Sequence, residues 1–179
     1  MTGRVERLKE KHGFSIQWRA FPLHPETPKE GMTLEALFKG RMVDISGMMA
    51  RLRDAAAAEG LPFGERNMTY NSRLAQELGK WTESEDKIED YNREVFQAYF
   101  AQGLNIGETA VLMAVAESAG LNPKEAEKVL AERRFSLSVD ADWERSRQLG
   151  IRAVPTFVMN GRMLVGAQPE TALDAFVRF

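Results

Sequence analysis

The sequence predicts an α/β fold in which strand segments near both ends of the chain enclose a long helical middle. Residues 14–21 (FSIQWRAF) alternate between apolar and polar side chains, which is the period of two expected of a strand. Near the C-terminus, the β-rich runs TFVM and RMLV are separated by Asn160-Gly161, a strong hairpin signal. Between these ends, most apolar side chains recur at intervals of three and four, the spacing of amphipathic helices.

The N-terminal part predicts a helix followed by a strand. Residues 3–12 carry Val5 and Leu8 among charged side chains, as in the last turns of an amphipathic helix, and Gly13 is a plausible stop. The strand over 14–21 comes next, and the proline-rich segment 22–31 ends it. We expect one face of this strand to carry Phe14, Ile16, Trp18 and Ala20.

The middle of the chain predicts several helices in succession. Thr82 and Glu85 form a capping box at the start of one of them. Another opens with Asn122 as its N-cap residue and Pro123 as its first residue. These helices are expected at 32–58, from 74 onward, after Thr82 to near Gly103, at 106–120 and at 122–134. A further helix is predicted over 138–150, and the chain closes as a helix after the hairpin, with Pro169 near its start.

Composition limits the classes of function. The chain has 179 residues, 44% of them hydrophobic, and a formal net charge of −2, so we expect one domain with a sizeable insertion. Without a basic patch, nucleic acid is an unexpected partner. No apolar run approaches the length of a membrane span, and the N-terminal residues lack the apolar core of a signal peptide. We therefore expect no membrane partner and a cytoplasmic location.

The side chains also limit the chemistry. The sequence contains no cysteine, which excludes disulfides, thiolate nucleophiles and cysteine-ligated metals within these residues. The two histidines, His12 and His24, stand in unrelated contexts, and no spacing matches a metal-binding motif. We therefore predict no metal site and assign no catalytic residue within this chain.

Pro155 is unusual because it opens the β-rich run 156–159, and a central strand normally excludes proline. One interpretation is a trans proline at the start of an edge strand. The other is a cis X-Pro bond, which marks a sharp and specified turn. In that case the backbone N–H and C=O of Val154 would point outward and would be able to pair with an extended peptide by strand addition.

At this point the sequence resembles a known family. GIRAVPTFVMNGRMLVGAQP (150–169) is similar to the cis-Pro loop, hairpin and final helix start of thioredoxin-fold proteins. IQWRAFPLHPE (16–26), NSRLA (71–75) and GLNPKEAEKVL (120–130) resemble the DsbA-like branch that includes FrnE-type proteins. Its relatives include 2-hydroxychromene-2-carboxylate isomerases and kappa-class glutathione transferases. The resemblance covers essentially the whole chain.

The resemblance implies a thioredoxin-like fold with a large all-helical insertion. The expected thioredoxin-like part comprises 1–30 and 134–179, and the expected insertion domain comprises 31–133. FrnE-type relatives begin with a strand that runs into a C-x-x-C at the N-terminus of the first helix, where a low-pKa thiolate attacks disulfides. Residues 1–14 align with the middle of that helix, so the first strand, which is central in this fold, and both cysteines are missing from the given chain.

Three explanations for this difference stay open. The start codon has been placed at an internal methionine, or the chain is a fragment with further residues upstream, or it is a natural short form whose gap another chain fills. A domain without its central strand should be poorly stable, because net stability is small, and this favours the first two explanations.

The resemblance implies three alternative functions. The first is a thiol–disulfide oxidoreductase whose catalytic residues lie upstream of Met1, with Ala153, Val154 and Pro155 docking a peptide or protein substrate. The second is a glutathione-dependent isomerase or transferase, in which Val154 holds the cysteinyl part of glutathione and the turn Gly166 to Gln168 reaches its γ-glutamyl end. The third is a redox-inactive peptide-binding module. A homodimer is a further expectation, because an uncovered sheet edge favours association.

Overall fold

The computed structural model describes residues 2–178 and divides the chain into two compact units. Unit 1 joins the two ends of the chain, up to Leu23 and from Ala141 onward, and unit 2 comprises His24–Asp140. Helix α8 (Ser136–Gln148) contains the point in the sequence, between Asp140 and Ala141, at which unit 2 ends and the second part of unit 1 begins. The domain limits predicted from the resemblance stay a prediction.

Unit 1 contains the predicted hairpin. Strands β3 (Thr156–Met159) and β4 (Arg162–Val165) pair antiparallel, with Thr156 opposite Val165 and Met159 opposite Arg162. The turn residues Asn160 and Gly161 have φ values of 51° and 73°, the left-handed conformations that a two-residue hairpin turn requires. The hairpin prediction is confirmed.

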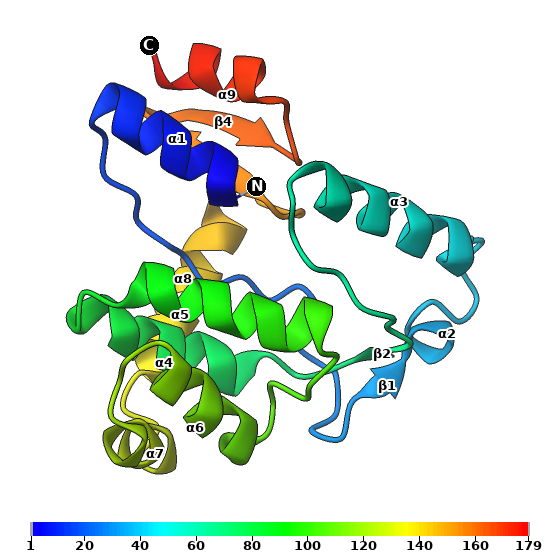
Figure 1. Cartoon of the computed structure of the whole chain (residues 1–179), viewed down its shortest axis with the longest axis vertical. Coiled ribbons are helices and arrows are strands. Elements are labelled where there is room, and N and C mark those ends of the chain that lie inside the picture. Colours follow the sequence, from blue (N-terminus) through cyan, green and yellow to red (C-terminus); the bar gives the residue numbers. More distant parts are fainter. Residues whose placement is uncertain (1, 179) are drawn as a thin grey trace. The chain divides into compact units, whose positions relative to one another are not determined.

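Two helices pack together beside this hairpin. Helix α1 (Thr2–His12) lies against α9 (Glu170–Val177), which closes the chain (Figure 1). Leu8 on α1 and Leu173 on α9 are each only 2% exposed. These two leucines therefore belong to the core of unit 1.

The predicted strand over 14–21 is wrong as secondary structure but right in its pattern of burial. Its apolar side chains are partly buried, whereas Ser15, Gln17 and Arg19 between them are exposed. In the part of the chain that the structure describes, the sheets consist of β1 with β2 and β3 with β4, so this segment has no paired neighbour. Because a strand requires a ladder of backbone hydrogen bonds, the segment stays extended without becoming one.

Unit 2 is mostly helical, with one short sheet. Strand β1 (Met32–Thr33) pairs with β2 (Met68–Thr69). The prediction that residues 31–133 are all-helical is therefore wrong at this short two-stranded sheet. Figure 1 shows helices α4 to α7 gathered together within this unit, with α3 apart from them. The remaining elements are α2 (Leu34–Leu37), α3 (Ile45–Ala58), α4 (Arg73–Ser84), α5 (Ile88–Phe96), the π-helical turn η1 (Gln97–Ala101), α6 (Thr109–Ser118) and α7 (Pro123–Ala131).

The core of unit 2 lies between α4, α5, α6 and α7. Leu78 on α4, Leu112 on α6 and Val129 on α7 are fully buried in it. Tyr91 on α5 is also buried, and its hydroxyl donates a hydrogen bond of 2.8 Å to the carbonyl of Ala75. This bond satisfies the one polar group that Tyr91 brings into the apolar interior.

The helix predicted over 32–58, with a possible bend or division at Gly47, is confirmed over Leu34–Leu37 and Ile45–Ala58, but the division comes before Gly47 because two side chains cap separate helices. The Thr33 hydroxyl accepts a hydrogen bond from Ala36 N at the start of α2, and Asp44 accepts one from Gly47 N at the start of α3. Between them, Gly40 adopts a φ of 79°, which a helix cannot contain.

The two predicted caps in the later helices have opposite outcomes. Asn122 caps α7 as expected, since its side-chain oxygen accepts a hydrogen bond of 2.9 Å from Lys124 N. Thr82 is not an N-cap, because it lies buried inside α4 and its hydroxyl donates to the carbonyl of Gly79. Helix α5 begins instead after Lys87.

Candidate functional site

The loop from Ala153 to Pro155, here called the Val154 loop, leads directly into β3. The Val154–Pro155 peptide bond is cis, and Val154 is 45% exposed. Among residues 2–178, the backbone N–H and C=O of Val154 have no hydrogen-bond partner. Both groups are therefore free to pair with the backbone of an extended chain.

Hydrogen bonds on both sides hold the Val154 loop in place. The Thr156 hydroxyl donates to the carbonyl of Ala153 at 2.7 Å, and Gly166 N donates to the carbonyl of Pro155 at 2.8 Å. The residues flanking Val154 are thus fastened while Val154 itself is not. The second bond also brings Gly166 next to Pro155, so these two predicted site residues lie together.

Gln168 is the predicted site residue whose side chain is already engaged. Its side-chain nitrogen Nε2 donates to the carbonyl of Val165 at 2.7 Å, and its backbone carbonyl accepts a hydrogen bond from Arg4 on α1. Gly166 makes the turn before it, with a φ of 91°. One of the two N–H donors of the Gln168 side-chain amide therefore closes the turn after β4.

An apolar face of the hairpin adjoins the Val154 loop. Residues directly opposite in an antiparallel pair share a face, so the pairs Thr156–Val165 and Val158–Met163 lie on the same side of the hairpin. Val158, Met163 and Val165 are all exposed. The alternation of side chains along the strands predicts which residues share this face. The exposure of the face to solvent is seen only in the structure.

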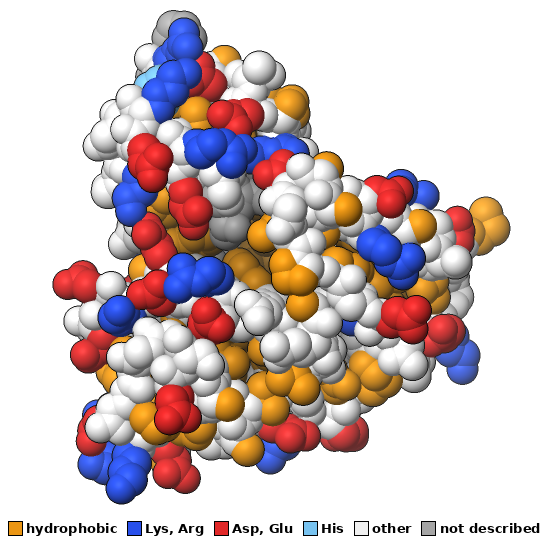
Figure 2. Space-filling model, in the orientation of Figure 1, with side chains coloured by type: hydrophobic (Ala, Val, Ile, Leu, Met, Phe, Trp, Pro, Cys, Tyr) orange, Lys and Arg blue, Asp and Glu red, His pale blue; other side chains and the backbone are white. Residues whose placement is uncertain are grey.

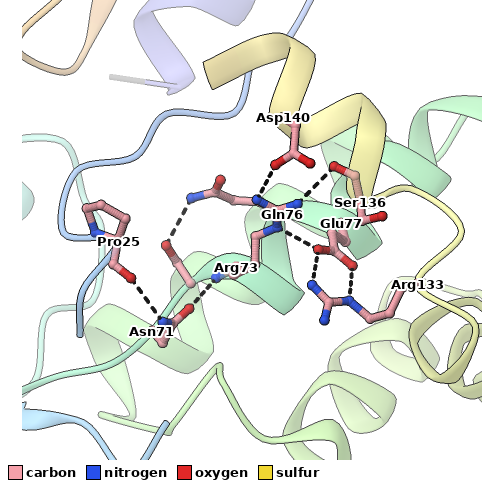
Figure 3. Close-up of polar contacts among 9 residues, drawn as sticks. Pro25, Asn71, Arg73, Gln76, Glu77, Arg133, Ser136 and Asp140 are labelled. Atoms are coloured by element: carbon pink, nitrogen blue, oxygen red, sulfur yellow. Dashed lines mark hydrogen bonds and ion pairs between the residues drawn. The ribbon is translucent and has the colours of Figure 1, made fainter. Parts of the chain in front are cut away.

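A second polar cluster lies in unit 2, around the buried side chain of Glu77 (Figure 3). Arg133 and Arg73 both donate to the Glu77 carboxylate, and Arg73 also donates to Asp140 and to the carbonyl of Ser136. Burial raises the pKa of Glu77, but the hydrogen bonds from Arg133 and Arg73 outweigh it and hold the pKa below its ordinary value.

This cluster is structural, since it joins α4 to the corner between α7 and α8 and its carboxylate is fully engaged by two guanidinium groups. Apart from Arg73 in the segment NSRLA, nothing in the sequence points to this cluster, because Arg133 and Asp140 lie 56 and 67 positions away from their partners on α4.

The described residues offer no alternative centre for metal chemistry. Within residues 2–178, no group of three His, Cys, Asp or Glu side chains is arranged to hold a metal ion. His12 Nε2 lies 2.8 Å from Asp174 Oδ1. The pKa of His24 is lowered, first by burial and then by the positive charge of Arg41. The chain has no cysteine, so its own side chains cannot carry out dithiol exchange.

The visible face of the molecule does not concentrate one sign of charge (Figure 2). On the face drawn in Figure 2, Lys and Arg side chains are interspersed with Asp and Glu. None of the helices in the described part of the chain combines the length and the apolar character needed to cross a bilayer.

The structure is mostly helical with few strands, and comparison with known proteins identifies its family and fold. The model of the DSBA-like thioredoxin domain matches residues 1–178, so the chain belongs to the DSBA-like thioredoxin family. The uncharacterized protein YwbO of Bacillus subtilis (strain 168) is 32% identical over 172 residues, which covers 94% of this chain and 83% of YwbO.

Solved structures show the same fold at lower identity. A probable DsbA oxidoreductase from Streptomyces coelicolor superimposes with a TM-score of 0.85 at 23% identity, covering 97% of this chain and 80% of that protein. A 2-hydroxychromene-2-carboxylate isomerase superimposes with a TM-score of 0.73 at 19% identity, covering 99% of this chain and 85% of the isomerase. The chain is thus a cysteine-free sequence with the DsbA-like thioredoxin fold.

Proposed function

We propose that the Val154 loop docks an extended polypeptide segment and serves as the substrate platform of a DsbA-family thiol–disulfide oxidoreductase. The observation that carries the proposal is the pair of unpartnered backbone groups on Val154, beside flanking residues that are held by hydrogen bonds. A donor and an acceptor on one residue match the two groups that an extended chain offers at every second residue.

The side chains around the loop favour an apolar segment. Val154 and the hairpin face of Val158, Met163 and Val165 present aliphatic surface, and a bound strand would cover part of it. We therefore expect the docked segment to carry β-branched or other aliphatic residues near its cysteine.

The redox step is a separate requirement. Reduction of a substrate disulfide oxidises two thiols, and none of these 179 residues supplies a thiol. In this proposal the dithiol comes from outside the given residues, and the chain itself provides binding without electron transfer. We therefore expect no disulfide reductase activity from the chain as given.

The glutathione-dependent isomerase function has weaker support. It requires the turn at Gly166 to Gln168 to recognise the γ-glutamyl end of glutathione. The side-chain amide of Gln168 already donates to the carbonyl of Val165, which uses one of the two N–H donors that this contact would have available. The fold of the isomerase relative supports this alternative only at the level of architecture.

A titration followed by backbone amide NMR tests the proposal. The ligand is an unstructured peptide of alternating valine and threonine around one S-methylated cysteine. The matched control is the same peptide with its central amide nitrogens methylated, which removes the donors needed for strand pairing. We expect saturable shifts at Ala153, Val154 and Thr156 with the first peptide and none with the second.

Two results would contradict the proposal. Equal shifts with both peptides would show that backbone pairing is not involved. Saturable shifts with glutathione, centred on Gly166 to Gln168 and absent with the peptide, would favour the isomerase function. The variant Val154→Pro, which lacks the backbone N–H, should bind the peptide more weakly than Val154→Ala, which keeps it.

A further inference from the structure

Arg66 in unit 2 packs against two aromatic rings, those of Tyr99 and Phe100, which meet edge to face with an interplanar angle of 75°. Its guanidinium carbon is 4.1 Å from the ring centroid of Tyr99 and 5.2 Å from that of Phe100. Its Nη2 donates to the Tyr99 hydroxyl at 2.7 Å and to the carbonyl of Met68 at 3.3 Å. The side chain is therefore held in one orientation by stacking and by hydrogen bonds to neutral groups.

The charge of Arg66 has no anionic partner among the residues that the structure describes. No carboxylate there lies within ion-pair distance, whereas Arg73, Arg93 and Arg133 of unit 2 each have one. Burial lowers the pKa of Arg66, and only Tyr99 and Tyr70 act in the opposite direction. A partly buried and uncompensated cation is costly, so its presence calls for an explanation.

The guanidinium still has donors to offer. An arginine carries five N–H donors, and both of those on Nη2 of Arg66 are used. The donors on Nε and Nη1 have no partner within residues 2–178. Arg66 is therefore a stacked, oriented cation with unused hydrogen-bonding capacity, which suits the recognition of a planar anion.

The surroundings of Arg66 are rigid. The loop that carries it is fastened to η1, because Gly64 N donates to the carbonyl of Phe100 at 2.9 Å. A Cβ atom on Gly64 would lie 2.1 Å from the carbonyl oxygen of Ala101, so the two backbones are in close contact. Tyr99 and Phe100 both belong to η1, and π-helical turns of this kind occur frequently at functional sites.

Two further phenylalanine rings, those of Phe63 and Phe96, pack against Phe100, and the rings of Phe96 and Phe100 are here called the Phe96–Phe100 wall. The ring of Phe100 lies 6.0 Å from that of Phe96 and 6.1 Å from that of Phe63, measured between centroids. Phe96 is 40% exposed, which is high for a side chain in an aromatic cluster. A ligand that reaches Arg66 therefore has aromatic surface beside it on which to pack.

We propose that Arg66 and the adjoining Phe96–Phe100 wall form a binding site for an organic carboxylate that carries an apolar aromatic body. The carboxylate accepts hydrogen bonds from the free guanidinium donors, and the body packs on the phenylalanine rings. This site lies in unit 2 and shares no residue with the Val154 loop. A test of one proposal therefore does not decide the other.

The test is a titration of the full chain with phenylacetate, followed through the Arg66 Nε–H signal in ¹⁵N-resolved NMR spectra. We expect a saturable shift of this signal, with acetate binding more weakly because it lacks the aromatic body. Arg66→Gln should weaken phenylacetate binding by about tenfold or more, since a hydrogen bond to a charged group is lost. Arg53→Gln, at an exposed position on α3, is the matched control and should leave binding unchanged.

Two further variants test whether the geometry of the guanidinium and the phenylalanine surface both contribute to binding. Arg66→Lys keeps the charge but loses the planar fork, and Phe96→Ala removes an exposed part of the wall, so both should fold and both should bind more weakly. The proposal is overturned if no shift saturates, if Phe96→Ala binds as tightly as the parent chain, or if inorganic phosphate binds more tightly than phenylacetate. It is equally overturned if Arg53→Gln weakens binding as much as Arg66→Lys.

Discussion

Glu77 and Arg133 form a two-pronged ion pair across unit 2. Arg133 Nε donates to Glu77 Oε2 at 2.7 Å, and Arg133 Nη2 donates to Glu77 Oε1 at 2.6 Å. Arg133 has a φ of 51°, a conformation that non-glycine residues seldom adopt. The pair therefore holds the corner between α7 and α8 against α4 at a point where the backbone alone would not favour it.

We predict that Glu77→Ala destabilises the protein by about 2 kcal/mol, because it removes the buried carboxylate that two arginines share. The loss is limited because Arg133 is 49% exposed and can be hydrated, and Arg73 keeps its ion pair with Asp140. Urea unfolding monitored by circular dichroism measures the change. Glu125→Ala is the control, because Glu125 forms an exposed pair with Lys128, and it should shift the midpoint much less. Equal shifts for the two variants would show that the buried pair has no special role.

The same carboxylate should make stability depend on pH. Burial raises the pKa of Glu77, but the hydrogen bonds from Arg133 and Arg73 outweigh it, so the folded-state pKa lies below the ordinary value of 4.5. The stabilising contribution is therefore fully present above pH 4.5 and is lost as the pH falls through the folded-state pKa.

Measurement of the urea midpoint from about pH 7 down to about pH 3 checks this prediction. Glu77→Gln cannot titrate, so its midpoint should fall less steeply below pH 4.5 than that of the parent chain. Other carboxylates with a lowered pKa, such as Asp90 and Asp174, act in the same direction in both proteins, and the difference between the curves isolates Glu77. Parallel curves would contradict the assignment.

The hairpin turn offers a test of backbone conformation alone. Gly161 has a φ of 73°, and a Cβ atom there would meet nothing within 4 Å. We predict that Gly161→Ala costs about 1–2 kcal/mol, purely from the left-handed conformation. Gly3→Ala is the matched control, since Gly3 lies in α1 and has ordinary helical geometry, and there alanine should stabilise by about 0.5–1 kcal/mol. Thermal unfolding measures both, and changes of the same sign would refute the prediction.

The hairpin was predictable because its signal is local. The conformations at Asn160 and Gly161 depend on the side chains of those two residues, and the flanking strands pair with each other. The segment 14–21 shows the limit of such reasoning. Its alternation correctly predicts which side chains are buried, but whether it becomes a strand depends on a neighbour that its own residues do not specify.

The parts that escaped prediction depend on contacts between distant residues. Glu77 and Arg133 are separated by 56 positions, and Arg66 and Tyr99 by 33, so no sequence window contains either pair. Thr82 shows a different failure. Its spacing to Glu85 matches a capping box, but the packing of α4 continues the helix through it and buries the hydroxyl.

The last prediction concerns the junction between α1 and α9. Asp174 on α9 accepts hydrogen bonds from Lys11 and His12 on α1, and it also pairs with Arg178. These hydrogen bonds, with that of Lys11 the strongest influence, hold the pKa of Asp174 below its usual range. We expect Asp174→Ala to free the C-terminal turn of α1, because Lys11 and His12 lose the carboxylate that ties them to α9.

Hydrogen exchange of the α1 amides measures this effect directly, since local opening exposes them before the whole unit unfolds. The amides near His12 should exchange several-fold faster in Asp174→Ala than in the parent chain. Glu170→Ala is the control, because Glu170 contacts α1 through Arg7 in the middle of that helix. It should accelerate exchange near Arg7 and leave the amides near His12 unchanged, whereas uniform acceleration along α1 in both variants would mean that Leu8 and Leu173, rather than these ion pairs, hold the helix in place.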